Sequence, residues 1–301
     1  MKILVTGSEG MLGSAIIRSL ESREIHTESA DMRDRDNPVD IRKELSLSDF
    51  MKKVNPDAVI HTAAFTDVDG CEKDPAKAHA INVEGTKNIS LACLEIKCPM
   101  LYISTDYIFD GKSESPYKEE DEAIPLNVYG NSKLEGENTV RSMLNSYLIV
   151  RTSWLFGEGG RNFVDSIISL AESGKKLKVV DDQKGSPTYT ADLGEAIAEL
   201  LLKAFARNRK TFSISHNTLN ITNSGSCTWY EFAKEILKLK GIKQASISPC
   251  ISSAIDRPAK RPKMSVLDNS RFIKLYGKPL PSWQDALSRY LNVGAASRRR
   301  I

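Results

Sequence analysis

Three glycines near the N-terminus constrain the fold of this chain more than any other feature. Gly7, Gly10 and Gly13 lie three residues apart, directly after the apolar run 2–6 and at the start of a helical pattern over 11–20. Glycine at these positions permits a tight turn, a close approach of the backbone to a pyrophosphate, and close packing of helix on strand. The free N–H groups of the helix then favour an anion. The sequence therefore predicts a dinucleotide-binding turn.

An acidic residue follows at the spacing that such a turn requires. Asp31 ends the second expected strand, residues 25–30, and a carboxylate there can accept hydrogen bonds from the ribose hydroxyls of NAD. Arg33 and Arg35 come directly afterwards and can instead contact the 2′-phosphate of NADP. Both signals are present, so the sequence leaves the choice between NADH and NADPH open.

The rest of the chain alternates strand-like and helix-like segments over its first two thirds. This alternation predicts right-handed crossovers and a parallel sheet covered on both faces by helices. The expected strands are 2–6, 25–30, 57–64, 100–109 and 147–156, and the expected helices are 11–20, 76–95 and 128–143. We therefore predict a doubly wound α/β fold of the Rossmann type.

The last third has a different character. Thr228 and Glu231 form a capping box before a helical pattern that ends at Gly241, residues 248–262 are rich in Pro and Ser and predict a loop, and an amphipathic helix begins near Trp283. We expect a dinucleotide-binding domain at 1–156, to which later segments return. A smaller α/β lobe that binds substrate follows at 157–292, and a disordered basic tail at 293–301.

Composition excludes several classes of protein. Lys and Arg number 42 against 39 Asp and Glu, and Arg298, Arg299 and Arg300 of the tail account for the whole excess, so the folded body lacks the basic face of a nucleic-acid binder. The sequence contains no run of about 18 apolar residues, so no membrane-spanning helix is predicted. The first apolar run is too short for a signal peptide. The five cysteines form no Cys-x-x-Cys pair and the four histidines have no metal-ligand spacing. We expect a cytoplasmic protein without a metal.

Tyr129 and Lys133 form the pattern Tyr-x-x-x-Lys at the start of an expected helix. Their spacing puts both side chains on one face of that helix. A phenol is a poor acid at neutral pH, and a neighbouring ammonium group favours the phenolate and lowers the pKa of the phenol. The pair can therefore protonate a carbonyl oxygen while a hydride reaches its carbon.

Ser104, Thr105 and Asp106 lie in the C-terminal part of the expected strand 100–109. In doubly wound sheets the ligand crevice lies beyond such strand ends. A hydroxyl group at this place can hydrogen-bond a substrate carbonyl and orient it.

Taken together, these patterns resemble the extended short-chain dehydrogenase/reductase superfamily. Within it, the chain resembles the dTDP-4-dehydrorhamnose reductases over about residues 1–290. The general resemblance rests on TGSEGMLG at 6–13, INVEGTKN at 81–88, the Ser/Thr pair and YGNSK at 129–133. The narrower one rests on AAFTDVDGCEKD at 63–74, STDYIFDG at 104–111, PLNVYGNSKLEGE at 125–137, RTSWLFGEGGRNF at 151–163, DDQKGSPT at 181–188, TWYEFA at 228–233 and RPAKRPKMSVLD at 257–268.

The resemblance implies reduction of the C4 keto group of a dTDP-4-keto-6-deoxy sugar, dTDP-4-dehydrorhamnose, to dTDP-L-rhamnose, with hydride from NADPH or NADH. Tyr129 would donate the proton, Lys133 would bind the nicotinamide ribose, and Thr105 would hold the keto oxygen. We expect cofactor contacts at Gly7, Gly10, Met11, Leu12, Gly13, Asp31, Arg33, Asp40, Ile41, Ala63, Ala64, Thr66, Ser104, Tyr129 and Lys133. We expect substrate contacts at Val68, Thr105, Asp106, Tyr107, Tyr129, Trp154 and Asn162.

Further contacts and assembly follow less directly. The segment 160–190 with Arg161, and the stretch 257–261, are expected near the nucleotide end of the substrate. Asn82 matches a helix asparagine that links a water relay in the superfamily, and its alternative role is a polar contact between helices. Some relatives hold magnesium at a dimer contact, but its carboxylate ligands have no clear counterpart here. We therefore predict no metal, and a monomer or a homodimer.

Two other functions remain open from the sequence. The chain also resembles the regulatory β subunit of methionine adenosyltransferase, which binds NADP and a partner, and the tail SRRRI would then be a docking segment. A nucleotide-sugar 4-epimerase with tightly held NAD is the third possibility. The intact set of Tyr129, Lys133 and Thr105 favours the reductase.

Overall fold

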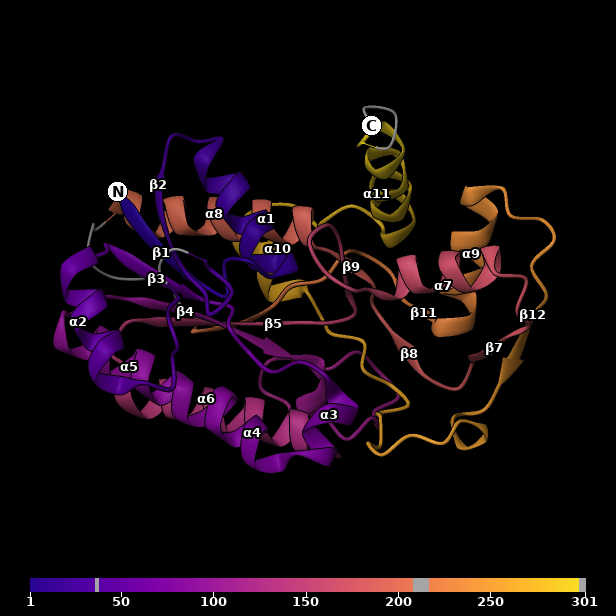
Figure 1. Ribbon diagram of the computed structural model, residues 1–301, viewed down its shortest axis with the longest axis horizontal. Coiled ribbons are helices and arrows are strands. Elements are labelled where there is room, and N and C mark those ends of the chain that lie inside the picture. Colours follow the sequence, from indigo (N-terminus) through magenta and orange to yellow (C-terminus); the bar gives the residue numbers. More distant parts are fainter. Residues whose placement is uncertain (36–37, 208–216, 298–301) are drawn as a thin grey trace.

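A parallel sheet of six strands forms the centre of the molecule in the computed structural model, which describes residues 1–35, 38–207 and 217–297 (Figure 1). The strands run across the sheet in the order β10-β5-β4-β3-β1-β2, and each neighbouring pair is parallel. Their bounds are Lys2–Thr6 for β1, His26–Ala30 for β2, Ala58–His61 for β3, Met100–Thr105 for β4, Tyr147–Thr152 for β5 and Thr218–Asn220 for β10. This arrangement confirms the predicted doubly wound sheet.

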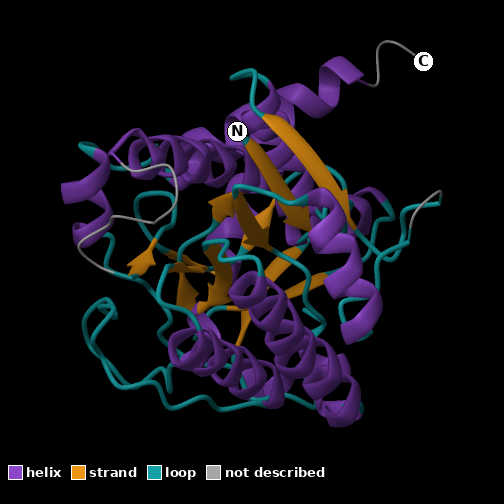
Figure 2. Cartoon of the chain, turned by 90° about the vertical axis from the view of Figure 1, so that its left-hand side faces the viewer, coloured by secondary structure: helices purple, strands orange, loops and turns teal. Residues whose placement is uncertain are grey.

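Helices cover both faces of this sheet, so its inner strands are apolar on both sides. Along β1, Ile3 and Val5 pack on one face and Leu4 packs on the other. The strands occupy the middle of the molecule with helices on either side of them (Figure 2). The first face is covered by α1 (Met11–Glu21), α8 (Thr190–Arg207) and α10 (Ser270–Tyr276), and the second by α2 (Glu44–Val54), α5 (Gly85–Glu95) and α6 (Val128–Met143).

The predicted helix over 76–95 is a composite. It consists of α4 (Pro75–His79), a π-helical turn (Ala80–Glu84) and α5, and the short helix α3 (Val68–Lys73) precedes it. The π-helical turn carries Asn82, whose buried side chain faces α6. Such turns inside helices often occur at functional sites.

The smaller group of elements lies beside the sheet, on the right in Figure 1. Its core is aromatic, because Phe156, Phe232 and Trp283 pack on one another between the helices. The helices are α7 (Phe163–Glu172), α9 (Trp229–Lys240) and α11 (Trp283–Ser297). The short strands pair as β7 (Leu177–Val180) with β12 (Ile247–Cys250), β8 (Lys184–Gly185) with β11 (Cys227–Thr228), and β6 (Leu155–Phe156) with β9 (Thr188–Tyr189).

Several expected boundaries were wrong. The strands expected to reach residues 64 and 109 end at His61 and Thr105, and a 3₁₀ turn over Asp106–Ile108 follows the second. The strand expected over 147–156 breaks after Thr152, because Trp154 has a left-handed backbone with φ of 47° that no strand accommodates. Part of the expected loop 248–262 belongs to β12, which pairs with β7.

The ends of the helices in the last third follow their sequence signals. Thr228 and Glu231 form the predicted capping box of α9, and Gly241 ends that helix with φ of 69°. Helix α11 continues through Ser297, into the segment 293–301 that was expected to form a tail. Arg298, Arg299 and Arg300 lie outside the described residues. Within the described ranges, no helix is both long and apolar enough to cross a membrane.

A buried ion pair joins α6 to β5. The Glu137 carboxylate is fully buried and accepts hydrogen bonds from Arg151 Nε at 2.9 Å and Arg151 Nη2 at 2.8 Å. Arg141, one turn along α6, donates to the same carboxylate at 2.7 Å. Burial alone would raise the pKa of Glu137, but the hydrogen bonds and charge of Arg151 outweigh it and hold the pKa below its usual value.

We expect Glu137→Gln to lower the free energy of unfolding by about 3–5 kcal/mol, because it leaves the Arg151 guanidinium buried without its counter-charge. Urea unfolding followed by circular dichroism measures the change. Glu235→Gln is the matched control, since it removes the same charge from an exposed pair with Lys238 and should cost less than about 1 kcal/mol. Equal losses in the two variants would contradict this role for Glu137.

Candidate active site

A cavity of about 750 Å³ opens beyond the carboxyl ends of β1, β3 and β4 and extends to the smaller lobe at Trp229. This edge is where open parallel sheets bind their ligands. The cavity is lined by all the residues predicted to contact a cofactor: Gly7, Gly10, Met11, Leu12, Gly13, Asp31, Arg33, Asp40, Ile41, Ala63, Ala64, Thr66, Ser104, Tyr129 and Lys133. Of the predicted substrate contacts it is lined by Val68, Thr105, Asp106, Tyr107, Tyr129 and Trp154.

The glycine turn forms one wall of the cavity with bare backbone. Gly7 has φ of 68°, and a Cβ there would collide with the backbone of Ala63, two residues beyond the end of β3. A Cβ on Gly13 would overlap the carbonyl oxygen of Gly7. Helix α1 begins after Gly10 without a side-chain cap, so its first N–H groups are available to a ligand. The wall therefore has the shape and polarity that a pyrophosphate requires.

At the far end of this wall, Asp31 and Arg33 form an ion pair. The Asp31 carboxylate accepts from the Glu9 N–H at 3.1 Å, from the Arg33 N–H at 2.9 Å and from the Arg33 guanidinium at 3.2 Å. Burial alone would raise the pKa of Asp31, but the hydrogen bonds from Arg33 and Glu9 lower it below its usual value. A carboxylate and a guanidinium group therefore lie side by side at the end of β2. Arg35 is exposed and does not line the cavity.

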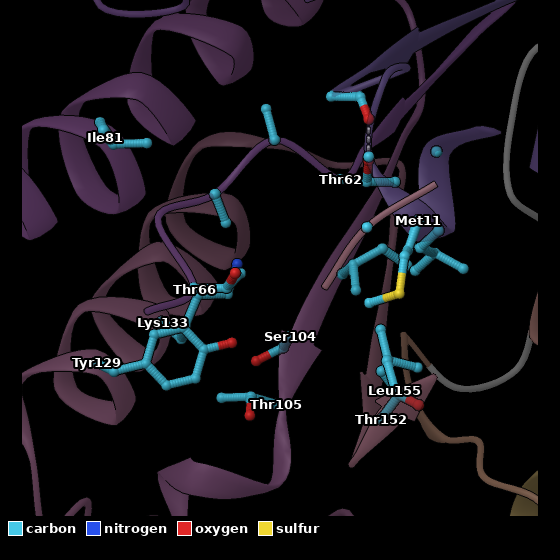
Figure 3. A pocket seen from close by; sticks show the side chains of 18 of the residues that line it. Met11, Thr62, Thr66, Ile81, Ser104, Thr105, Tyr129, Lys133, Thr152 and Leu155 are labelled. Atoms are coloured by element: carbon cyan, nitrogen blue, oxygen red, sulfur yellow. Dashed lines mark hydrogen bonds between the residues drawn. The ribbon is translucent and has the colours of Figure 1, made fainter. Parts of the chain in front are cut away.

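Tyr129, Lys133, Ser104 and Thr105 converge in the cavity from two elements. The first two project from α6, and the other two stand at the carboxyl end of β4 (Figure 3). The Tyr129 phenol points toward Ser104 and Thr105. The sequence predicted this convergence from residues separated by more than 20 positions along the chain.

The predicted lowering of the Tyr129 pKa was wrong for this structure. Burial raises the pKa of the Tyr129 phenol, with a smaller opposing effect from the nearby Thr105 hydroxyl. Burial also lowers the pKa of Lys133 to about 7, although the Glu137 carboxylate opposes this shift. Desolvation therefore outweighs the attraction between the two groups, because each is buried in its neutral form more readily than in its charged form.

The Lys133 ammonium group packs against a buried aromatic ring, which in turn contacts a buried histidine. Lys133 Nζ lies 4.0 Å from the centroid of the fully buried Tyr102 ring. His61 lies beside Tyr102 and is bonded to Thr6 at 2.6 Å and to Thr86 at 3.2 Å. Burial, and secondarily the charge of Lys133, lower the pKa of His61 to about 3, so His61 is neutral at physiological pH. The floor of the site is therefore rigid and uncharged.

Trp154 packs against two neighbours. Its ring stacks on Trp229 with centroids 3.4 Å apart and planes 6° apart. A Cβ on Gly185 would also meet the indole of Trp154, so Gly185 packs closely against it. Trp229 therefore covers one face of the ring expected to contact a sugar. Trp229 was not among the predicted contacts, although it belongs to the segment TWYEFA at the start of α9.

The prediction for Asn162 is not supported by its position. Asn162 does not line the cavity, and its side chain caps α7 by accepting from the Asp165 N–H at 3.0 Å. Its amide group also donates to the Gly157 carbonyl and to Asp165. The adjacent Arg161 does line the cavity.

Asn82 serves as a contact between segments. Its amide donates to the Phe65 carbonyl at 3.0 Å and to Ser132 Oγ at 2.9 Å, and it accepts from the Phe65 N–H at 2.8 Å. Both amide protons are therefore used within the protein, which favours the contact role over a water relay.

Other cavity residues carry no local sequence signal. They lie on separate segments that only the folded sheet brings together, with Ile81 on the π-helical turn, Leu155 on β6 and the others on loops: Met32, Val39, Arg42, Ile81, Ser153, Leu155, Gly159 and Gly160. Arg42 pairs with Asp40 at 2.8 Å beside the Asp31–Arg33 pair. In the described part of the chain, no cluster of three His, Cys, Asp or Glu side chains has the arrangement of a metal site.

Residues 1–295 match the family model described as the RmlD substrate binding domain. The chain belongs to this family. It is 38% identical to a dTDP-4-dehydrorhamnose reductase of Streptomyces griseus, over 95% of this chain and 91% of that protein. The predicted resemblance to these reductases is confirmed.

Two solved structures of dTDP-4-dehydrorhamnose reductases have the same fold. The enzyme of Clostridium acetobutylicum is 39% identical, with a TM-score of 0.86 over 97% of this chain and 99% of its own. The enzyme of Bacillus anthracis, solved in complex with NADP, is 34% identical, with a TM-score of 0.86 over 96% of this chain and 98% of its own.

We expect the stacked indoles of Trp154 and Trp229 to give an exciton signal in circular dichroism, because two parallel rings in contact couple their transitions. Trp229→Phe should abolish this signal. Trp283→Phe is the control, since it changes the same residue type in the core of the smaller lobe, away from the pair. Persistence of the signal in Trp229→Phe would contradict the stacked arrangement.

Proposed function

We propose that this chain reduces the C4 keto group of a dTDP-4-keto-6-deoxy sugar, converting dTDP-4-dehydrorhamnose to dTDP-L-rhamnose. One observation carries the proposal: Tyr129, Lys133 and Thr105 converge in the cavity that the glycine turn opens. The relatives named as dTDP-4-dehydrorhamnose reductases span nearly the whole chain, which supports this substrate class.

The glycine wall fits a nicotinamide dinucleotide. Gly7 and Gly13 leave room where any Cβ would intrude, and the start of α1 offers N–H groups to the pyrophosphate. Asp31 and Arg33 would face the adenosine ribose, with Asp40 and Ile41 near the adenine. When bound, the reduced cofactor supplies the hydride.

The residues of the chain supply the proton and the orientation. Tyr129 donates its phenolic proton to the keto oxygen as the alcohol forms. Lys133 binds the nicotinamide ribose and places a positive charge beside the developing phenolate, which stabilises it. Thr105 donates a hydrogen bond to the same keto oxygen and fixes its position.

The sugar and its nucleotide would occupy the part of the cavity toward the smaller lobe. Val68, Asp106, Tyr107 and Trp154 line this part of the cavity and would contact the sugar. Arg161 also lines the cavity and would meet the diphosphate, since guanidinium groups bind phosphate oxygens in pairs, whereas residues 257–261 do not line it.

We infer a cytoplasmic enzyme that acts as a monomer or homodimer without nucleic acid. The five cysteines are free thiols, which supports a reducing compartment. Size-exclusion chromatography with light scattering tests the assembly.

Tyr129→Phe should lower kcat for NADPH oxidation with dTDP-4-dehydrorhamnose by about a hundredfold to ten-thousandfold, since it removes the proton donor and little volume. NADPH should still bind, as followed by the change in its fluorescence. Tyr147→Phe, at the start of β5 and outside the cavity, should keep normal turnover.

The same assay separates the alternatives. A reductase releases one oxidised cofactor for each sugar reduced, whereas an epimerase retains NAD and releases none. A regulatory subunit would bind NADPH without oxidising it. Normal turnover in Tyr129→Phe, or no NADPH oxidation by the unaltered chain, would refute the proposal.

We expect Asp31→Ala to weaken the binding of NADH more than that of NADPH. Arg33→Ala should weaken the binding of NADPH more than that of NADH. The carboxylate suits the ribose hydroxyls and the guanidinium suits the 2′-phosphate, and each such charged hydrogen bond contributes about 1.5–3 kcal/mol. Calorimetric titration with each cofactor should therefore give selective losses of roughly ten- to hundredfold.

Arg35→Ala is the matched control for this pair of variants. Arg35 is exposed two residues beyond Arg33 and lies outside the cavity, so its loss should leave both affinities nearly unchanged. Equal losses for the two cofactors in Asp31→Ala would refute its contact with the ribose.

A further inference from the structure

Asp106 stands directly behind Thr105 at the end of β4, in the 3₁₀ turn that follows the strand. It is 2% exposed, and its Oδ1 accepts a hydrogen bond from Thr105 Oγ1 at 3.1 Å. Its other oxygen, Oδ2, is buried without a well-formed hydrogen bond among the described residues, and the Ser265 hydroxyl stabilises the carboxylate only in part. A carboxylate would therefore be poorly solvated here.

The Thr105 hydroxyl has one proton and two lone pairs. One lone pair accepts from the Tyr107 N–H at 3.2 Å, and in the present arrangement the proton goes to Asp106. A hydroxyl that donates to Asp106 cannot at the same time donate to a keto oxygen in the cavity. The role proposed for Thr105 therefore needs a second hydrogen-bond arrangement.

A protonated Asp106 supplies that arrangement. The carboxylic acid donates its own proton to the remaining lone pair of Thr105 Oγ1, and the Thr105 proton then turns toward the cavity. Every donor and acceptor of the Thr105 hydroxyl is used: it accepts from Tyr107 and Asp106 and donates to the ketone. No bond to hydrogen is broken, since only the direction of the hydrogen bond reverses.

We propose that Asp106 is a positioning residue that acts as a neutral carboxylic acid and aims the Thr105 hydroxyl at the keto oxygen. This inference rests on the proposed function, because the ketone is the group that receives the hydrogen bond. It assigns Asp106 a role beyond contact with the sugar, and it predicts that the enzyme loses activity when this carboxyl group ionises.

The surroundings of Asp106 favour the neutral acid. Burial raises its pKa to about 7, and the hydroxyl groups of Ser265 and Thr105 offset only part of this shift. Its titratable neighbours are the phenols of Tyr107 on the same turn and Tyr129 on α6.

The nearest basic groups do not pair with Asp106. Arg261 is bound to Asp69, with Nη2 at 2.7 Å from the carboxylate, and neither Arg261 nor Arg257 is among the groups that shift the pKa of Asp106. Lys133 lies on α6 over the Tyr102 ring. Asp106 therefore has no counter-ion among the described residues.

The first test compares Asp106→Asn with the unaltered enzyme across pH. An amide N–H can donate to Thr105 but never ionises, so the ratio of kcat in Asp106→Asn to kcat in the unaltered enzyme should rise about tenfold for each pH unit above the carboxyl pKa. Lys133 titrates in both proteins, so its contribution cancels in this ratio. If Asp106 instead works as a carboxylate that binds the sugar, Asp106→Asn raises KM at every pH and the kcat ratio stays constant, which overturns the proposal.

The second test measures the carboxyl group directly and needs no substrate. In protein labelled with carbon-13 at the aspartate carboxyl carbons, one resonance absent from Asp106→Asn should titrate with a midpoint near 7. Thr105→Val should raise that midpoint, because it removes the hydroxyl that stabilises the carboxylate, and Thr105→Ser should restore it. A midpoint below about 5, near the ordinary value for aspartate, overturns the proposal.

The two tests separate this inference from the proposed function. An unaltered chain that fails to oxidise NADPH with the keto sugar refutes the reductase, whatever the midpoint of Asp106. If the chain reduces the keto sugar but the Asp106 carboxyl group titrates at the ordinary pKa of aspartate, the proposed function stands and the role of Asp106 as a neutral acid is refuted.

Discussion

The structure depends on a contact between bare backbones at the glycine turn. Gly7 rests against Ala63 at the end of β3, and Gly13 rests against the Gly7 carbonyl, with no space for a side chain at either glycine. This contact fixes where α1 begins, and therefore where its N–H groups point. It also sets the distance between β1 and the wall formed by β4 and α6, where Tyr129 and Lys133 stand. The position of the cavity thus depends on the absence of a side chain at Gly7 and at Gly13.

Burial governs the chemistry on the other side of the cavity. Lys133 and Asp106 are buried and Tyr129 is half-buried, and each has its pKa shifted in the direction that favours the neutral form. Glu137, which has Arg151 as its partner, keeps a lowered pKa although it is buried. A buried group here keeps its charge where a fixed counter-ion faces it, and otherwise shifts toward neutrality.

Much of the site was predictable because its signals are local. The glycine spacing, the Tyr129–Lys133 pair and the Ser104–Thr105 pair each specify a turn, a helix face or a strand end within a few residues. The environment that sets their pKa values was not predictable, because it comes from elements such as β3 and the C-terminal segment near Ser265. Asn162 shows the same limit, since its glycine-rich loop suggested a phosphate contact and only the fold revealed a helix cap.

The fold was predictable to a similar extent. Alternating apolar runs identified the inner strands, yet β5 was extended through Trp154, whose backbone is set by its packing between Gly185 and Trp229. Strands β7 and β12 are short and pair across about 70 residues, a register that no local pattern encodes.

The return of a late strand to the sheet has a consequence for synthesis. Strand β10, at residues 218–220, covers the edge of β5, and α8 covers the apolar side of α1. Both leave the ribosome long after the glycine turn has emerged. The nascent chain therefore exposes an unpaired sheet edge and the apolar face of α1 for most of its translation. Chaperones bind such surfaces, and chains that leave them exposed aggregate. A protein truncated after β5 would keep the glycine turn but lose β10 and α8, which cover the sheet edge and α1.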